Sequence, residues 1–589
     1  FNVNCFGHAA ALPGLMQSFG QDSYLLTRPS WEEMEQPGRI FRWQGYEGGP
    51  EVIVVHPPFF NSHELTVEGV SECIERLPEG YEHTLLCLGV GDHGGGPTEA
   101  QIAWVREHRE AIDGWRMEFS TLDGYVEIAR QSRDRLPTVV GELQPHAIGC
   151  YSVYRPVKVA LRRAEHLLAQ AELLSQHDEE TRQALDDGWK RVAFHHFHDT
   201  LAGSCTPTAY ISVLDQLGGA CAAADEALHF ELRRRIVDLP DDSLQRIVML
   251  NANDVPFHGF LEHEPWIGPW AKRWLKDCYL VDENDQPVPF QTMDPEPIAF
   301  SDRNDTVLPR IFFRADLEPG ELRVVRIARG GSNGTKLGIK VEANEAISSD
   351  SGARWSMAGL AWGDGPTLPV GLSLLRDMSD TWSHGLLRFS EEAMEKVSWG
   401  DPKIIDSGPL MASAIVSGTI GESKLTAEWR VFAGEPYIEL KLDVFWAERF
   451  RILKMEISTP SPSDIRLDGV MGTNLGRKND GSELPMRDWT LLGDAASPRL
   501  AVVAPDVYGL DARPERARLT LLRSSMMAQH DPAPPLAPRA VISDQGAHTF
   551  RFRFFFGESL SVEDLDRHAS AMQRPVVVTD ATGGMPTIY

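Results

Sequence analysis

The spacing of apolar residues divides the chain into three regions, of which the first ends near residue 150. It contains a short apolar run at 84–90, a stretch with helical spacing at 101–111 and a second short strand pattern at 138–140. Strands that alternate with helices predict an α/β layer, mostly parallel, in which functional groups gather at the carboxyl ends of the strands. We therefore expect residues 1–150 to form an α/β domain.

The second region is helical. Its apolar positions recur every three or four residues, which is typical of helices with one buried face, and the first helix shows this stripe at Val157, Ala160, Leu161, Ala164, Leu168 and Ala171. A second helix is expected from its cap candidate Asp178 to about His198, and a third from about Pro207 to Val237. Three helices joined by short connections predict a three-helix bundle for residues 151–240.

The third region alternates apolar and polar residues. Every second residue is apolar at 438–446, and phenylalanine occupies alternate positions at 550–556. Such alternation, with frequent glycine and proline, is typical of antiparallel sheets packed as sandwiches. Because about 350 residues are too many for one sandwich, we expect a small β domain at 241–330 and one or more large β-sandwich domains at 331–589.

Composition excludes several classes of protein. The 589 residues carry 57 Lys and Arg against 85 Asp and Glu, a formal net charge of -28, so we expect neither nucleic acid nor a membrane as partner. The 42% hydrophobic content suffices for large cores and argues against disorder. The seven cysteines are dispersed without a CxxC pair, and no targeting segment is visible. The cysteine pattern favours a reducing compartment, and we expect a cytoplasmic location. The absence of a targeting segment adds little, because the chain opens with Phe1 rather than Met.

Two short segments place polar side chains where a strand is expected to end. Positions 4–8, with the sequence Asn-Cys-Phe-Gly-His, lie at a predicted strand-to-helix turn. Positions 91–98 bring Asp92 and three glycines after the apolar run, where a ligand can approach the backbone closely. An equally good interpretation of Asp92 is a turn residue that accepts hydrogen bonds from nearby amides.

A third segment, 194–203, is rich in histidine. On one continuous helix, His195, His198 and Asp199 would share a face, and this spacing is compatible with metal ligation. The alternative is a helix carboxyl end, where cationic histidines interact with the helix dipole before Gly203. The pattern taken alone is compatible with both interpretations.

Together, these motifs resemble glycoside hydrolase family 38, the class II α-mannosidases, and particularly its bacterial members. The matching segments follow one order along the chain: Phe6-Gly7-His8 with Leu12-Pro13, Arg28-Pro29, Gly91 to Thr98, Gly141-Glu142-Leu143, Phe197-His198-Asp199, Asp380-Thr381-Trp382 and Leu521-Leu522-Arg523-Ser524. Short accidental matches would not recur in this order across several hundred residues.

The resemblance implies a fold and a chemistry. The fold is an α/β barrel-like catalytic domain, partial in this chain, followed by a three-helix middle domain and C-terminal β-sandwich domains. The chemistry is retaining hydrolysis of terminal α-mannosides, in which one Asp forms a covalent mannosyl ester and a second Asp protonates the leaving oxygen. A zinc ion holds the vicinal hydroxyls of the sugar. The expected ligands are therefore α-mannoside glycans and Zn²⁺.

Matched position by position, the resemblance assigns roles to five residues that this chain retains. Asp92 corresponds to the acid/base, His198 to a zinc ligand, and Asp199 to a residue that holds a sugar hydroxyl. Phe6 would pack on the face of the sugar. Arg28 would lie near the nucleophile and keep a carboxylate there ionised.

The nucleophile position departs from the family pattern. It is Asn4 rather than aspartate, and a carboxamide does not ionise, is a poor nucleophile and offers zinc only a neutral oxygen. The family's upstream His-x-Asp zinc motif would precede Phe1, so we expect an N-terminally truncated chain that binds zinc weakly or not at all. Two functions stay open: an α-mannosidase-type hydrolase, and a catalytically inactive carbohydrate-binding relative on the same scaffold.

Overall fold

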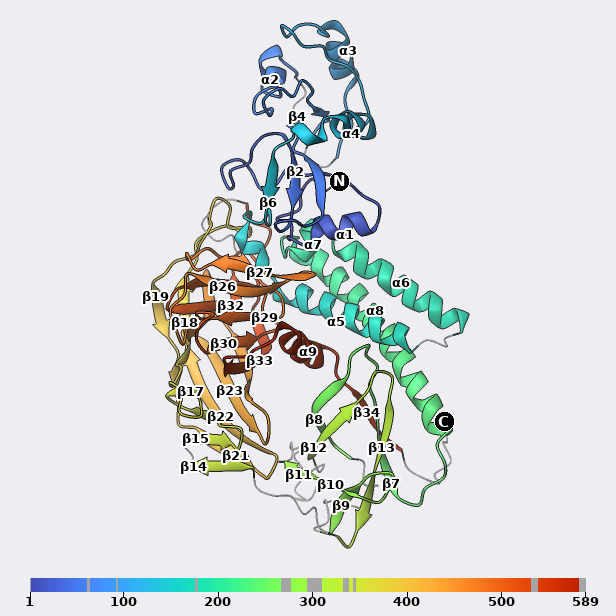
Figure 1. The fold of residues 1–589 in the computed structure, drawn as a ribbon, viewed down its shortest axis with the longest axis vertical. Helices are drawn as coiled ribbons and strands as arrows, with labels where there is room; N and C mark the ends of the chain where they lie inside the picture. The colour runs from blue at the N-terminus through green and yellow to red at the C-terminus, as the bar shows by residue number, and fades with distance from the viewer. Residues whose placement is uncertain are drawn as a thin grey trace. The chain divides into compact units, whose positions relative to one another are not determined.

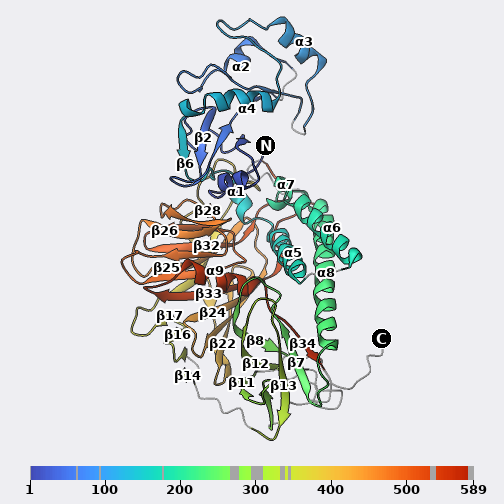
Figure 2. The ribbon, with the colours of Figure 1, turned by 45° about the vertical axis from the view of Figure 1, so that its right-hand side comes forward.

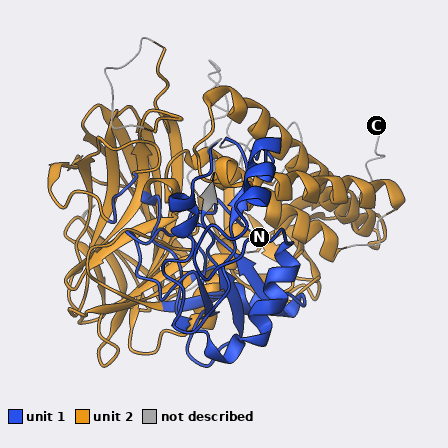
Figure 3. Cartoon of the chain, turned by 90° about the horizontal axis from the view of Figure 1, so that it is seen from above, with its two compact units in different colours: residues 1–148, 384–387, 470–475 blue, residues 149–383, 388–469, 476–589 orange. Residues whose placement is uncertain are grey.

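The computed structural model describes most of the chain, namely residues 2–60, 64–91, 94–174, 178–265, 277–293, 310–331, 338–342, 346–530 and 539–581. The chain forms two compact units (Figure 3). Unit 1 comprises Phe1–Ile148, His384–Leu387 and Val470–Leu475, and unit 2 comprises Gly149–Ser383, Arg388–Gly469 and Gly476–Tyr589. The helical region and the β region therefore share one unit, and the finer domain boundaries at 240 and 330 remain a prediction.

Unit 1 is built on a four-stranded sheet with the strand order β1-β3-β2-β6, of which Figure 1 labels β2 and β6. The strands are β1 (Ser23–Leu25), β2 (Ile40–Gln44), β3 (Glu51–Val55) and β6 (Thr138–Val140). A two-stranded parallel pair is formed by β4 (Phe59–Phe60) and β5 (Cys87–Leu88). The helices are α1 (Leu12–Ser18), α2 (Val67–Ser71), α3 (Glu99–Glu107) and α4 (Leu122–Gln131), with the 3₁₀ turn η1 (Arg133–Arg135).

The sheet is mostly parallel, as predicted, because β1 pairs with β3 and β2 with β6 in parallel. The exception is the antiparallel pair of β2 and β3, which is joined by the short loop 45–50 instead of a crossover helix. The apolar run at 84–90 forms only the two-residue, partly exposed strand β5 rather than a long buried strand. In the described part of unit 1 the strand order is open, so a closed barrel is not observed.

Both faces of the sheet are buried, because the central strand β3 is apolar on each side. Val52 and Val54 pack with Trp43 on the face that α1 covers through Met16. Ile53 packs on the other face against residues of α4. A continuous apolar run is what a strand covered on two faces requires.

Unit 2 begins with three helices that pack on one another (Figure 2). The 3₁₀ turn η2 (Ile148–Tyr151) spans the junction between the units and precedes α5 (Arg155–Leu173), α6 (Glu179–His195), the single turn α7 (His198–Leu201) and α8 (Pro207–Val237). The predicted stripe of α5 is buried against α8, and Asp178 caps α6 by accepting from the Thr181 N–H at 2.8 Å. The predicted helical bundle is confirmed, except that α6 ends at His195 rather than at His198.

The first of these helices is capped by a residue nearly four hundred positions away. Tyr154, which precedes α5, has left-handed backbone geometry, and its N–H and that of Arg155 donate to the two carboxylate oxygens of Asp544 at 2.7 Å each. Burial raises the pKa of Asp544 to about 6, although these two amides lower it. Asp544 thereby joins the helical part of unit 2 to its β part.

Replacing Asp544 by alanine is expected to destabilise the protein, because two buried amides lose their acceptor. We expect a loss of about 2 kcal/mol in the free energy of unfolding at about pH 4.5. Folding raises the pKa of Asp544, so its stabilising contribution decreases as the pH rises from the pKa of the unfolded state toward 6. The destabilisation caused by Asp544→Ala should therefore be smaller at pH 7 than at pH 4.5. Urea denaturation at both pH values measures this, with the exposed turn residue Asp494→Ala as the matched control.

The rest of unit 2 consists of antiparallel sheets. One small sheet has the order β10-β9-β13-β7-β34, formed by β7 (Gln245–Leu250), β9 (Cys278–Val281), β10 (Pro287–Val288), β13 (Leu322–Arg329) and β34 (Val577–Ala581). A second small sheet contains β8 (Phe257–His263), β11 (Phe290–Met293) and β12 (Arg310–Leu317). A third contains β14 (Ile339–Glu342), β15 (Ala346–Ser349), β16 (Ala353–Ser356) and β17 (Gly359–Trp362).

Two large sheets form the main sandwich. The six-stranded sheet contains β18 (Val370–Arg376), β19 (Ala393–Lys396), β25 (Arg451–Ser458), β28 (Leu484–Pro485), β31 (Gly509–Arg513) and β32 (Arg516–Ser524). The ten-stranded sheet contains β20 (Ser398–Trp399), β21 (Lys403–Ser407), β22 (Met411–Ile420), β23 (Ser423–Phe432), β24 (Tyr437–Trp446), β26 (Ile465–Val470), β27 (Thr473–Lys478), β29 (Trp489–Leu492), β30 (Arg499–Val503) and β33 (Gly546–Gly557). The predicted antiparallel β architecture is confirmed.

The alternating residues of the sequence line the core of this sandwich. Leu440 and Leu442 of β24 and Phe552 of β33 face inward and meet residues of the six-stranded sheet such as Met455. The polar residues between them therefore face outward, where the helix α9 (Val562–Gln573) packs on neighbouring strands. Within the described residues, no helix combines the length and the apolar character needed to cross a bilayer.

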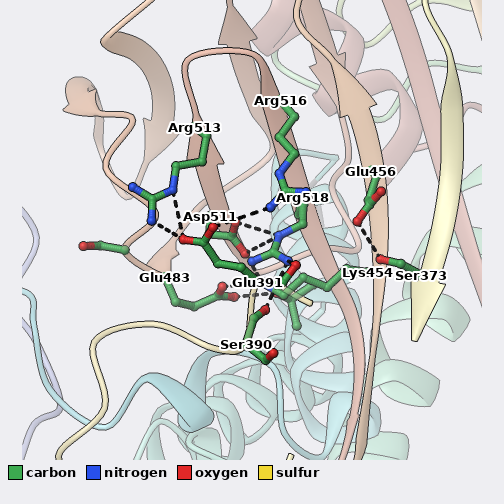
Figure 4. A network of polar contacts seen from close by, with 12 residues as sticks. Ser373, Ser390, Glu391, Lys454, Glu456, Glu483, Asp511, Arg513, Arg516 and Arg518 are labelled. Carbon is green, nitrogen blue, oxygen red and sulfur yellow. Dashed lines mark hydrogen bonds and ion pairs between the residues drawn. The ribbon is translucent and has the colours of Figure 1, made fainter. Parts of the chain in front are cut away.

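The six-stranded sheet also buries a charged network (Figure 4). Lys454 Nζ donates to Glu483 Oε2 and to Asp511 Oδ2 at 2.5 Å each, and all three side chains are almost completely buried. Arg518 Nε donates to Asp511 Oδ1 at 2.8 Å, and Thr520 Oγ1 donates to the second oxygen of Glu483. Burial raises the pKa of Glu483. The stability of this sheet thus depends on complete pairing of buried charges.

Candidate functional site

The segment that carries Asn4 and Phe6 follows a short pairing with the sheet of unit 1. The Asn2 N–H donates to Leu25 O at 2.9 Å, so the chain enters beside the carboxyl end of β1, as the strand-end interpretation of these residues predicts. Asn4 then lies in a turn with its side chain exposed, and Phe6 is partly buried. The nucleophile position therefore lies at the strand end where the α/β pattern predicts functional groups.

His8 attaches this segment to the loop that carries Arg28. Its Nε2 donates to Arg28 O at 3.0 Å, and its Nδ1 accepts from the Tyr24 hydroxyl at 3.0 Å. Burial lowers the pKa of His8 to about 4, so the ring is neutral near pH 7 and both of its nitrogens have partners. His8 is thus a structural residue, and it ties positions 4–8 to a partly buried Arg28.

The same loop contributes a residue that the sequence pattern did not indicate. Glu33 Oε2 accepts from the Ser30 N–H at 2.8 Å, and Glu33 Oε1 accepts from His146 Nδ1 at 2.6 Å. Burial raises the pKa of Glu33, but His146 and the Ser30 amide together lower it, so the carboxylate stays ionised. The His146 ring lies 5.5 Å from that of Phe6, between centroids. A carboxylate–imidazole pair therefore adjoins Phe6.

A distant segment of unit 1 extends this aromatic group. His384 belongs to residues 384–387, which cluster with unit 1, and its ring centroid lies 6.3 Å from that of His146. His146 follows the Gly141-Glu142-Leu143 motif, and His384 follows Asp380-Thr381-Trp382. Because each histidine follows a recognised motif by only a few residues, position in the sequence is the one signal that could have identified His146 and His384.

Asp92 lies outside the described residues, and its assignment as acid/base stays a prediction. Hydrogen bonds link the described residues on either side of it. The Val90 N–H donates to Gly95 O at 3.1 Å, and Thr98 and Gln101 form a reciprocal capping box at the start of α3. Gln101 Nε2 also donates to Gly89 O at 3.2 Å. These contacts attach α3 to the chain on both sides of position 92.

The histidine-rich segment of unit 2 does not form one continuous helix. Phe197 has an extended ψ of 138°, which separates α6, ending at His195, from α7, beginning at His198. His195 is buried, and its Nε2 donates to Gln216 Oε1 at 3.2 Å. His198 and Asp199 adjoin each other, with Nε2 and Oδ2 3.8 Å apart. The prediction that His195, His198 and Asp199 share one helix face is therefore wrong.

The described residues do not supply a complete zinc site. No group of three or more His, Cys, Asp or Glu side chains in this part of the chain is arranged to hold a metal ion. Of the expected ligands, His198 offers one imidazole and Asn4 one neutral amide oxygen, whereas zinc sites use three or four protein ligands. Asn4 belongs to unit 1 and His198 to unit 2. Their convergence on one site remains a prediction.

Three protein-family models match the chain in order. The N-terminal domain of glycosyl hydrolases family 38 matches residues 1–142, the alpha mannosidase middle domain matches 147–234, and the family 38 C-terminal domain matches 367–532. Together they cover most of the chain, and the break between the first two lies near the boundary between the two units.

Curated relatives match a shorter stretch. "Alpha-mannosidase 2C1" of Homo sapiens is 28% identical over 215 residues, which are 34% of this chain and 20% of that protein. "Alpha-mannosidase G" of Dictyostelium discoideum is 28% identical over 225 residues, and "Alpha-mannosidase" of Saccharomyces cerevisiae is 27% identical over 230. These matches cover 36% and 35% of this chain. The matched stretch spans only 20% and 21% of those two proteins.

Two solved structures share the fold. A protein in the glycosyl hydrolase family 38 from Enterococcus faecalis superposes with a TM-score of 0.74 at 12% identity, covering 98% of this chain and 75% of that one. An alpha-mannosidase from Enterococcus faecalis V583 superposes with a TM-score of 0.76 at 12% identity, covering 99% and 77%. The likeness extends over nearly the whole chain and concerns the fold.

Proposed function

Because the chain belongs to glycoside hydrolase family 38, we propose that it is an α-mannosidase-type glycosidase chain that binds terminal α-mannosyl residues of glycans. The observation that carries this proposal is the ordered match of three domain models of one family along one chain. A solved structure of an alpha-mannosidase that has the same fold over 99% of this chain supports the proposal.

The residues of unit 1 supply a sugar-binding surface in this proposal. Phe6 packs on the apolar face of the mannose ring, since its own ring is only partly buried. Asn4, exposed in the neighbouring turn, both donates and accepts hydrogen bonds, which suits vicinal hydroxyls. Arg28 provides the positive charge beside them. Asp92 is the proposed acid that protonates the leaving oxygen.

The residue at position 4 also determines whether the protein hydrolyses an α-mannoside or only binds it. Retaining hydrolysis needs a carboxylate that attacks the anomeric carbon, and a carboxamide does not form the glycosyl ester. We therefore propose that this chain binds α-mannosides and turns them over slowly at most. The alternative of a carbohydrate-binding relative without activity is favoured by the same residue. For unit 2, the family resemblance implies a zinc-ligand role for His198 and a sugar-hydroxyl role for Asp199, although the described residues hold no complete zinc site.

Binding of methyl α-mannoside to the full protein tests the proposal. Phe6→Ala is expected to weaken binding about tenfold, because a tenfold change corresponds to about 1.4 kcal/mol, within the range of one lost aromatic contact. Phe19→Ala is the matched control, since Phe19 is 77% exposed, more than any other phenylalanine whose side chain is described in unit 1, and lies just after α1. Calorimetric titration measures both. Equal binding of methyl α-mannoside and methyl α-glucoside, or an unchanged Phe6→Ala, would contradict the proposal.

A further inference from the structure

Unit 2 contains a cavity of about 460 Å³ that no motif of the sequence accounts for. Its lining residues come from the outward face of the ten-stranded sheet, from β8, β11 and β12 of a small sheet, and from α9. Figure 1 labels β8, β11, β12 and α9. Its volume lies within the range of small-molecule sites, about 300–1,000 Å³. Five Lys or Arg and four Asp or Glu side chains line it. The lining is therefore charged, which selects against an apolar ligand.

Two of the acidic side chains are paired with arginines, Glu262 with two of them and Glu428 with one. Arg310 Nη2 lies 2.6 Å from Glu262 Oε2, and Arg430 contacts the other oxygen of Glu262. Arg430 Nε also donates to Glu428 Oε1 at 2.6 Å. These guanidinium–carboxylate contacts form a continuous chain from β12 and β8 to β23. The carboxylates on this side of the cavity thus have cationic partners.

The remaining acids are satisfied as well. Arg553 Nε donates to Glu439 Oε2 at 3.0 Å. Asp406 is buried and accepts from the Ser413 hydroxyl at 2.8 Å. These carboxylates therefore offer few free hydrogen-bond acceptors to a ligand. The side chains of the lining that could bind a charged ligand are the cationic ones.

Two cations of the lining have only long ion-pair contacts with carboxylates among the described residues. Lys441 of β24 lies directly opposite Arg551 of β33 on one side and Glu428 of β23 on the other, and Glu428 already accepts from Arg430. The ion-pair contacts of the two cations are long, 3.7 Å from Lys441 Nζ to Asp443 and 3.8 Å from Arg551 Nε to Asp506, and the two side chains are 45% and 46% exposed. Like charges directly opposite on neighbouring strands destabilise a sheet. An anion between them would convert this repulsion into attraction.

We propose that this cavity binds a phosphate group, free or as the monoester of a small molecule, between Lys441 and Arg551. Arg551 donates a planar pair of N–H groups and Lys441 a point charge, a combination that suits a tetrahedral oxyanion. The volume of the cavity exceeds that of a bare phosphate. The side chains of Met293 and Met572 provide an apolar surface that the organic part of a phosphate ester can contact. The chain's net charge of -28 repels anions in general, so binding depends on this local cationic pair.

Calorimetric titration of the full protein at low salt tests the site, because salt screens partly exposed charges. The probes are inorganic phosphate, a hexose 6-phosphate and the unphosphorylated hexose. The double variant Lys441→Gln with Arg551→Gln is expected to raise the Kd for the phosphorylated probe at least tenfold. The control Lys396→Gln with Lys424→Gln removes the same charge from exposed positions elsewhere on the sandwich and should leave the Kd within about twofold.

The two phosphate probes distinguish the source of the ligand. Tighter binding of the hexose phosphate than of inorganic phosphate identifies an ester, whereas equal binding identifies free phosphate. Absence of binding by both phosphate probes overturns the proposal. So does an equal loss of affinity in the control double variant, because that would show attraction by overall charge alone. Both double variants exchange exposed side chains, and an unchanged melting temperature verifies that they fold.

Discussion

Replacing Asn4 by aspartate is expected to raise hydrolysis of an aryl α-mannoside by at least about 100-fold in the full protein, because it supplies the missing nucleophile. The side chain of Asn4 is exposed at the end of β1, so a carboxylate fits there without a desolvation cost. Arg28 in the adjoining loop would keep that carboxylate ionised. An aryl leaving group needs little protonation, so the assay reports on position 4 rather than on Asp92. Initial rates of phenol release measure the effect.

Two controls separate nucleophilic chemistry from a change in charge. Asn2→Asp places the same charge two residues upstream on another exposed side chain and should leave the rate near that of the unmodified chain. Asn4→Ala removes the carboxamide without adding charge. A rate for Asn4→Asp no higher than that of Asn4→Ala, in a protein that still binds the mannoside, would leave sugar binding as the function of this chain.

The spacing of apolar residues predicted those helices and strands that bury one face along their whole length. The apolar stripe of α5 and the alternation in β24 and β33 each follow from burial of one face, so residue spacing alone was sufficient to predict the helical bundle and the antiparallel sheets. The cap at Asp178 and the helix start at Pro207 are local signals too, because each acts within one turn.

Contacts between distant segments account for what the sequence pattern missed. Glu33 and His146 are 113 residues apart, and His384 comes from a segment beyond the helical region, so no local spacing connects them with Phe6. The break at Phe197 is likewise a matter of backbone geometry, which residue spacing does not reveal. The antiparallel pairing of β2 with β3 in the otherwise parallel sheet of unit 1 is likewise a matter of strand pairing, which single strands of three to five residues do not specify.

Replacing Lys454 by methionine is expected to lower the free energy of unfolding by about 3–5 kcal/mol, because it leaves two buried carboxylates without their shared cation. Glu483, whose pKa burial already raises, would then take up a proton, so the loss should be smaller at about pH 5 than at pH 8. Adding Glu483→Gln should recover part of the loss, since it removes one uncompensated charge. The control Lys396→Met exchanges a lysine that is 75% exposed and 3.9 Å from Glu456, and should change stability by less than about 0.5 kcal/mol. Chemical denaturation at both pH values measures all of these variants, and an equal loss for Lys454→Met and Lys396→Met would show that the buried network does not stabilise the sandwich.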